Sequence, residues 1–336
     1  MTRRGDFALV AVAGVLWGTG GLAGAELADA AGLSSGAVAS SRLLGGGGLL
    51  LVTVALRGGL RRVPRTRAAG VQVLATAVLI AVFEAAYFAA VARAGVAVAT
   101  LVTLGAAPVL VATLSAVRAR TWPAPRTVLA LVLALVGLAA LVLGRGAHGS
   151  ADVGGILLAL GAAVAFGGLT LVNARPVDGL GVSSLTALAF TLGGALLVPY
   201  AMLGPGGFAL PHDGAGWWWL VYLAAVPTAA AYVAYFTGLR TVPATVATLL
   251  SLLEPVTAAV LATLVRDERL GAAGVLGAAS LVAAVVVLRP RDAHSPTMVR
   301  PGDAAEHSRH PALTEHGASI PGVMRVSDPR EGPAAR

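Results

Sequence analysis

A glutamate and a proline stand side by side in the otherwise apolar stretch LLSLLEPVTAAVLATLV, which runs from Leu249 to Val265. A carboxyl group removed from water favours its protonated form unless a cation lies nearby, so Glu254 could relay protons or bind substrate. Ser251 would share its helix face. Pro255 lacks a backbone donor, which frees a carbonyl near Ser251 and predicts a hinge. The alternative is a structural Glu254 that bonds to a neighbouring helix.

Two further charged residues, Arg42 and Glu84, fall inside apolar runs. A charge at the centre of a bilayer costs about 2.5–3.5 kcal/mol on insertion scales, and such residues usually face a cavity or a partner. At about 1.5 Å of rise per residue, both lie about 9 to 10 Å from the same membrane face, whereas Glu254 lies about 15 Å from either face. We expect Arg42 and Glu84 to interact, either as a structural ion pair or as a gate that also binds a substrate carboxylate.

Four aromatic residues with polar groups also lie within apolar runs, namely Trp17, Tyr87, Tyr232 and Tyr235. A buried tyrosine hydroxyl or indole N–H usually needs a hydrogen-bond partner. We interpret these side chains as the lining of a substrate cavity, with ordinary packing between helices as the alternative. Together with Arg42, Glu84, Ser251 and Glu254 they form the predicted substrate-binding set.

The composition indicates that much of this chain is solvated by lipid. Of its 336 residues, 57% are hydrophobic and 12% are charged, and the mean hydropathy is +0.82. Soluble globular chains carry about 25% charged residues. All 24 basic residues are Arg, and we do not interpret the net charge of +8 as a nucleic-acid signal. Cysteine is absent, which excludes disulfides and thiolate metal sites.

Ten runs are apolar and long enough to span a bilayer, since about 20 residues suffice. Ala, Leu, Val and Gly dominate them without two-residue alternation, which predicts helices and not barrel strands. The fold class is therefore an all-α integral membrane protein. The expected helices cover residues 7–25, 36–56, 69–91, 96–116, 127–144, 153–173, 184–203, 217–239, 244–265 and 271–288.

The distribution of Arg predicts the orientation of the chain. Most Arg residues outside the tail fall in connections that are cytoplasmic if the N-terminus is cytoplasmic, as expected from the positive-inside rule. We therefore expect both termini in the cytoplasm and the protein in the plasma, or inner, membrane. Residues 289–336 are rich in Pro, Arg, His, Asp and Glu, which predicts a disordered cytoplasmic tail.

An internal repeat relates the two halves. The motif Ala-Tyr-Phe recurs at residues 86–88 and 234–236, and each copy is followed by Val-Ala-Thr and then by Pro108 or Pro255. We predict a first repeat at residues 1–148 and a second at 149–288, each of five helices. An odd number of helices inverts the second repeat relative to the first, as in many transporters. Pro108 and Pro255 are both candidate hinges, but only the second half carries a glutamate before its proline.

The chain resembles the EamA-like permeases of the drug/metabolite transporter superfamily over about residues 7–288. The resemblance rests on LWGTGG at Leu16–Gly21, SSRLLGGG at Ser40–Gly47 and the Glu-Pro segment with the Gly-rich stretch that follows it. It implies a ten-helix secondary transporter that exports a small metabolite, an amino acid or a drug. We attribute coupling to proton antiport at Glu254; a proton-independent facilitator or exchanger, or an uptake permease, is the alternative.

Other classes of function lack their sequence signatures. No HExxH motif and no phosphate-loop lysine occurs, and the ten apolar runs contain no His, which argues against an enzyme, including one that acts on lipids. We expect no cofactor, no metal and no nucleic-acid partner. The expected partners are a small-molecule substrate, protons and the bilayer. Gly14/Gly18 and Gly20/Gly24 form GxxxG pairs, which we assign to packing within a monomer, with a dimer as the alternative.

Overall fold

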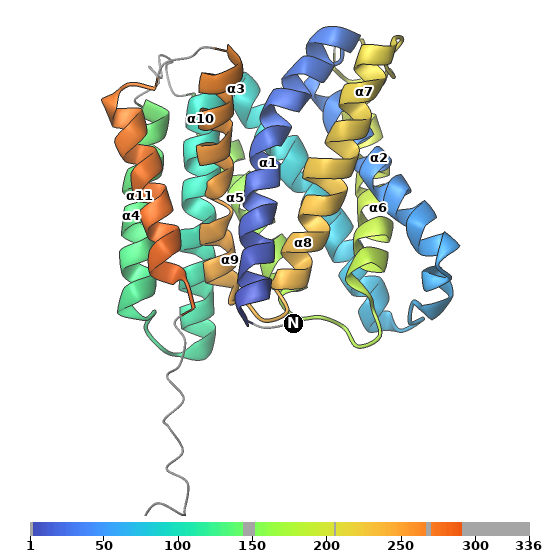
Figure 1. The fold of residues 1–336 in the computed structure, drawn as a ribbon. Coiled ribbons are helices and arrows are strands. Elements are labelled where there is room, and N and C mark those ends of the chain that lie inside the picture. The colour runs from blue at the N-terminus through green and yellow to red at the C-terminus, as the bar shows by residue number, and fades with distance from the viewer. Residues whose placement is uncertain (1–2, 144–151, 205, 267–269, 291–336) are drawn as a thin grey trace, which may run out of the picture. The chain divides into compact units, whose positions relative to one another are not determined.

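A computed structural model describes residues 3–143, 152–204, 206–266 and 270–290, and every regular element in those ranges is helical (Figure 1). Residues 291–336, most of the predicted tail, lie outside the described residues. The elements are α1 (Arg3–Ala31), α2 (Ser35–Leu56), the short 3-10 helix η1 (Gly59–Arg62), α3 (Arg67–Ala119), α4 (Pro125–Leu143), α5 (Val153–Asn173), α6 (Val182–Met202), α7 (Gly214–Leu223), the π-helix η2 (Ala224–Ala230), α8 (Ala231–Gly238), α9 (Ala244–Leu250), α10 (Leu253–Arg266) and α11 (Ala272–Leu288).

The helices confirm the all-α class but not the count of ten. Within the described ranges, eight helical segments are long and apolar enough to cross a membrane, and α11 is a shorter apolar helix. The difference arises partly in α3, where the expected runs 69–91 and 96–116 form one helical segment of 53 residues. Gly95 interrupts it with φ 79° and ψ 160°, a conformation that glycine adopts without strain. The number of separate spans remains a prediction.

Two prolines shape the helices of the second half. Pro227 lies in η2, where Thr228 Oγ1 donates a 2.7 Å hydrogen bond to the carbonyl of Leu223. Pro255 cannot donate to the carbonyl of Ser251, and the Glu254 N–H donates to it instead at 2.9 Å. This tighter turn separates α9 from α10 and places Glu254 at the start of α10.

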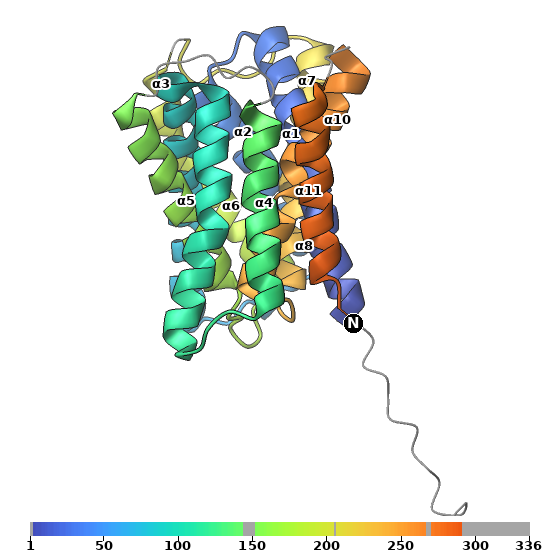
Figure 2. The same ribbon diagram turned by 90° about the vertical axis from the view of Figure 1, so that its left-hand side faces the viewer.

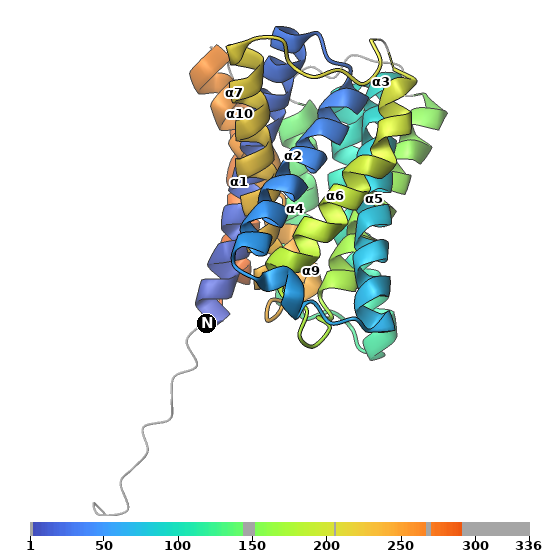
Figure 3. The same ribbon diagram turned by 90° about the vertical axis from the view of Figure 1, so that its right-hand side faces the viewer.

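Glycines bring α2 and α6 into close contact (Figure 3). A Cβ atom on Gly47 of α2 would lie 2.4 Å from the backbone nitrogen of Thr191 in α6. Conversely, a Cβ on Gly194 of α6 would lie 2.7 Å from the backbone nitrogen of Leu44 in α2. A glycine of each helix thus contacts the backbone of the other helix. This permits a short distance between the helices that larger side chains would prevent.

The α4–α11 contact has the same reciprocal form (Figure 2). A Cβ on Gly137 of α4 would lie 3.0 Å from the backbone nitrogen of Leu281, and one on Gly277 of α11 would lie 2.5 Å from that of Leu141. Ser280 Oγ adds a 2.8 Å hydrogen bond to the carbonyl of Leu133.

The remaining helices surround the interior. Helix α1 packs on α8 and α10. Helix α5 packs along α3 on both sides of Gly95, since Gly168 lies against Leu79 and Gly167 against Val111. Buried aromatic side chains from α1, α5, α6 and α8 meet between these helices as the centre of the largest apolar cluster.

Candidate substrate cavity

A cavity of about 360 Å³ lies between the two halves of the chain. That volume is within the usual range of sites for small molecules. Six of the eight predicted substrate-binding residues line it: Trp17, Arg42, Glu84, Tyr87, Tyr232 and Glu254. They come from α1, α2, α3, α8 and α10, so residues far apart in the sequence meet at one site.

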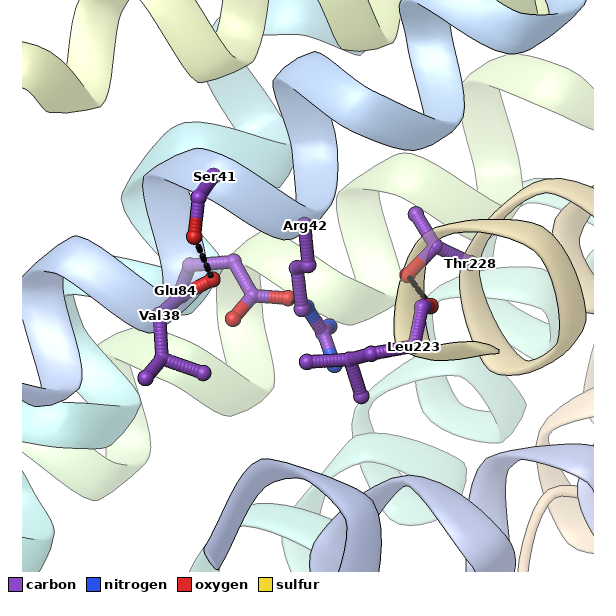
Figure 4. Close-up of polar contacts among 6 residues, drawn as sticks. All are labelled: Val38, Ser41, Arg42, Glu84, Leu223 and Thr228. Atoms are coloured by element: carbon purple, nitrogen blue, oxygen red, sulfur yellow. Dashed lines mark hydrogen bonds and ion pairs between the residues drawn. The ribbon is translucent and has the colours of Figure 1, made fainter. Parts of the chain in front are cut away.

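Arg42 and Glu84 form an ion pair, as their shared depth predicts (Figure 4). Arg42 Nη2 donates to Glu84 Oε1. The Glu84 side chain is 3% exposed and that of Arg42 is 16% exposed, so Arg42 is the partner that reaches the open space. Arg42 Nε is buried and has no hydrogen-bond partner in the described part of the chain.

Hydroxyl groups near this pair are satisfied by their own helices (Figure 4). Ser41 Oγ donates to the carbonyls of Ala37 and Val38 at 2.6 and 3.2 Å, and Thr228 Oγ1 donates to Leu223. No described side chain other than Glu84 takes up the charge of Arg42 through an ion pair.

Glu254 lines the same cavity but has no such partner. Its side chain is partly exposed, and no described residue donates a hydrogen bond to its carboxyl group. Helix α1 approaches this point through two glycines: a Cβ on Gly14 would lie 2.6 Å from the carbonyl oxygen of Leu250, and one on Gly18 would lie 2.6 Å from that of Glu254. These glycines allow α1 to pack against the turn that positions Glu254.

Aromatic rings form much of the cavity wall. The ring centroid of Trp17 lies 4.9 Å from those of Tyr232 and Tyr235 and 6.0 Å from that of Phe166, distances typical of attractive ring pairs. Trp17 Nε1 is buried and, like Arg42 Nε, has no partner among the described residues. Of the four aromatic residues expected to line a cavity, Trp17, Tyr87 and Tyr232 do so.

Two predicted site residues, Tyr235 and Ser251, do not line the cavity. The Tyr235 hydroxyl is fully buried and forms a 2.9 Å hydrogen bond with Thr170 Oγ1. Ser251 Oγ is also buried and donates to the carbonyl of Thr248 at 2.7 Å. The two candidate hinges, Pro108 and Pro255, are buried in α3 and α10 and are not lining residues either.

Several lining residues were not predicted from the sequence, notably Phe83, Phe88 and Phe166. Phe88 belongs to the repeated Ala-Tyr-Phe motif, and that repeat could have indicated Phe88 as a lining residue. Phe83 and Phe166 carried no comparable signal, because an aromatic residue in an apolar helix can equally face lipid or a neighbouring helix. Gly20 and Gly24 also line the cavity, beyond their predicted role in helix packing.

The exposed part of the cavity wall lies at one end of the bundle. Ser35 and Val96 line its open end and are themselves exposed; they lie at the start of α2 and next to the break at Gly95. Toward the end where α1 begins, Tyr235, Phe236 and Leu239, in α8 and the turn after it, are buried and do not line the cavity. Helix α2 begins at the end of the bundle opposite the N-terminus (Figure 1), so the exposed lining residue Ser35 lies at that end.

Among the described residues, no group of three or more His, Cys, Asp or Glu side chains is placed to hold a metal ion. The candidate site is therefore defined by the ion pair, the separate carboxyl group and the aromatic wall.

Known proteins resemble this chain over nearly all of its helical part. Residues 4–143 and 153–289 match the model of the EamA-like transporter family. A Bacillus subtilis protein described as "Uncharacterized transporter YwfM" is 31% identical over 279 residues, which cover 83% of this chain and 92% of that protein. A solved structure titled "Crystal structure of protein" superposes with a TM-score of 0.71 at 21% identity, covering 85% of this chain and 98% of the other, and supports the fold alone.

Proposed function

This chain belongs to the EamA-like transporter family and is a multi-pass membrane transporter, and from that premise we propose that it is a secondary active exporter of a small molecule coupled to protons. The substrate is a metabolite, an amino acid or a drug, and the chain works as a monomer. The observation that carries the proposal is the cavity in which Glu254 stands without a partner beside the neutral Arg42–Glu84 pair.

The proposed architecture is ten spans in two inverted repeats, 1–148 and 149–288. The helix contacts support it, because they come in pairs that a two-fold axis in the membrane plane would exchange. Gly47 meets Thr191 as Gly194 meets Leu44, and Gly137 meets Leu281 as Gly277 meets Leu141. Reciprocal contacts of this kind are the signature of a two-fold interface.

The proposed orientation places both termini in the cytoplasm of a cell with the protein in its plasma membrane. The Arg-rich connections support this orientation. The open end of the cavity then faces outward, and the buried layer around Tyr235 closes the cytoplasmic side. Residues 289–336 form a cytoplasmic tail in this proposal.

In the proposed cycle, Glu254 takes up a proton while the cavity is open to the outside and releases it on the cytoplasmic side, where substrate takes its place. Trp17, Tyr87 and Tyr232 contact the substrate, and the Arg42–Glu84 pair binds it or gates its path. Tyr235 and Ser251 contribute only when the helices move, since both are turned away from the present cavity. Pro108 and Pro255 are the proposed hinges.

The test uses proteoliposomes that contain a trapped pH-sensitive dye, an imposed pH gradient and a panel of amino acids, nucleobases and organic amines. We expect at least one compound to dissipate the pH gradient and to accumulate against its own concentration gradient. Glu254→Gln keeps the shape of the protonated carboxyl group but cannot cycle between protonated and ionised forms, so it should insert into the membrane yet lose accumulation driven by the pH gradient. Glu254→Asp should be impaired less.

Accumulation by Glu254→Gln equal to that of the parent would contradict proton coupling at this residue. If counterflow by the parent protein is independent of the pH gradient, the protein is a facilitator or exchanger. Thr263→Val is the matched control, because Thr263 is on α10 but its hydroxyl bonds only to the carbonyl of Ala259.

A further inference from the structure

The charged groups that line the cavity do not balance. Among the described lining residues there is one cation, Arg42, and there are two carboxyl groups, Glu84 and Glu254. Arg42 is paired with Glu84, so this unit is neutral. An ionised Glu254 therefore gives the cavity one uncompensated negative charge, which is costly when the cavity is closed to bulk water.

No other described element contributes a cation to the cavity wall. The ionisable lining residues besides these three are Tyr87 of α3 and Tyr232 of α8, whose side chains are neutral or negative. The described residues of α11, which packs against α10, include no ionisable side chain, and α1 contributes no charged residue to the cavity wall. The missing positive charge must come from a proton or from a ligand.

We propose that the transported substrate is a monocationic organic amine with an aromatic or apolar body, whose ammonium group binds at the Glu254 carboxylate. The proposal rests on the proposed function of this cavity as the transport site and names its substrate class. When the ammonium ion enters, the proton on Glu254 leaves to solvent, and the site is neutral before and after. A zwitterion at an ionised Glu254 would leave the excess negative charge in place.

The wall of the cavity suits such a ligand. Trp17, Phe83, Phe88, Phe166 and Tyr232 surround the space, and aromatic faces attract organic cations as well as apolar bodies. A substrate carboxylate would instead compete with Glu84 for the charge of Arg42.

The test is calorimetric titration of the purified protein with three probes that share one ring: 2-phenylethylamine, L-phenylalanine and 3-phenylpropanoate. Measurement in buffers of different ionisation enthalpy counts the protons released. We expect the amine to bind about tenfold or more tightly than the other probes and to release up to one proton. Glu254→Gln should weaken amine binding by about ten- to hundredfold and abolish proton release, whereas Thr263→Val should match the parent.

The outcomes separate the substrate class from the transport function. Binding of the zwitterion or the anion as tight as that of the amine, no binding of the amine, or amine binding unaffected by Glu254→Gln would each overturn the amine proposal. Counterflow of some other compound would leave the transport function standing in those cases. Amine binding with proton release but without counterflow of any compound would instead support the site and refute transport. A Glu254→Asp variant that elutes as a monodisperse peak and still releases protons excludes misfolding as the cause.

Discussion

At the scale of single residues, the site contains two carboxyl groups in different circumstances. Glu84 is almost completely buried and bonded to Arg42, whereas Glu254 is partly exposed to the cavity and receives no hydrogen bond from the described residues. A buried ion pair resists the loss of either member, because the remaining charge is then uncompensated. The carboxyl group of Glu84 is therefore held in an ion pair, whereas in our proposal the carboxyl group of Glu254 exchanges a proton for a ligand.

Removal of one member of the Arg42–Glu84 pair should destabilise the protein strongly. Arg42→Leu or Glu84→Ala should each cost about 3–5 kcal/mol, because each leaves an unpaired buried charge. The exchanged double variant, Arg42→Glu with Glu84→Arg, should recover part of the loss. Thermal unfolding in detergent measures the effect. Equal loss of stability in the single and exchanged variants would show that the pair contributes little through its charges.

Both charged sites could be predicted from the sequence because ionisable residues in apolar helices are rare and costly. Glu254, Arg42 and Glu84 all line the cavity, and Arg42 does pair with Glu84. Hydroxyl groups were less predictable, because a helix can satisfy them locally: Ser251 bonds to the carbonyl of Thr248, and Tyr235 bonds to Thr170, 65 residues away. The rotation of each helix about its axis decides whether a hydroxyl group faces the cavity. That rotation depends on packing that the apolar pattern does not encode.

At the scale of helices, the two halves differ at a hydrogen bond made by equivalent tyrosines. Tyr87 bonds to Thr100 at 2.8 Å across the break at Gly95. By the repeat, Tyr235 corresponds to Tyr87 and Thr248 to Thr100, since both pairs have the same spacing. Yet Tyr235 bonds to Thr170, and Thr248 Oγ1 donates to the carbonyls of Ala244 and Thr245 in its own helix.

If the halves exchange conformations during transport, Tyr235 should bond to Thr248 when the cavity opens to the opposite side. Thr170→Val should then favour that opposite state, and Thr248→Val should favour the present one, each by about fivefold for a hydrogen bond of about 1 kcal/mol. The chain has no cysteine, so Ala28→Cys at the cavity wall reports the accessible side through its reaction rate with an impermeant maleimide. If both variants shift the maleimide reaction rate in the same direction, the two halves do not exchange conformations.

The positions of most helices could be predicted, but their breaks were harder to interpret. Apolar runs bounded by Gly, Pro and Arg located the helical segments, and Pro255 correctly marked a disturbed turn before Glu254. At Gly95 one residue interrupts the helix where a connection was expected. Pro227 gave no expectation of a π-helix, because the extra residue in that turn depends on how η2 packs against α1 and α2.

At the scale of the whole molecule, the predicted topology makes the site of a C-terminal fusion informative. With an even number of spans and a cytoplasmic N-terminus, a reporter enzyme that is active only outside the cytoplasm should remain silent when fused after Leu288. A second reporter that is active only inside should be active at the same position. The converse pair of results would mean that the number of spans or the orientation of α1 is wrong.

The carboxyl group of Glu254, the one among the described lining residues that has no ion-pair partner, has a consequence for energetics. If Glu254 holds either one proton or one monovalent ligand, each cycle moves equal charge in both directions. The membrane potential contributes about 2.3 kcal/mol per elementary charge per 100 mV, and that contribution would cancel. A cell in alkaline surroundings, where the voltage is high but the outside is poor in protons, would then gain no export from this protein, whereas acid surroundings would drive export strongly.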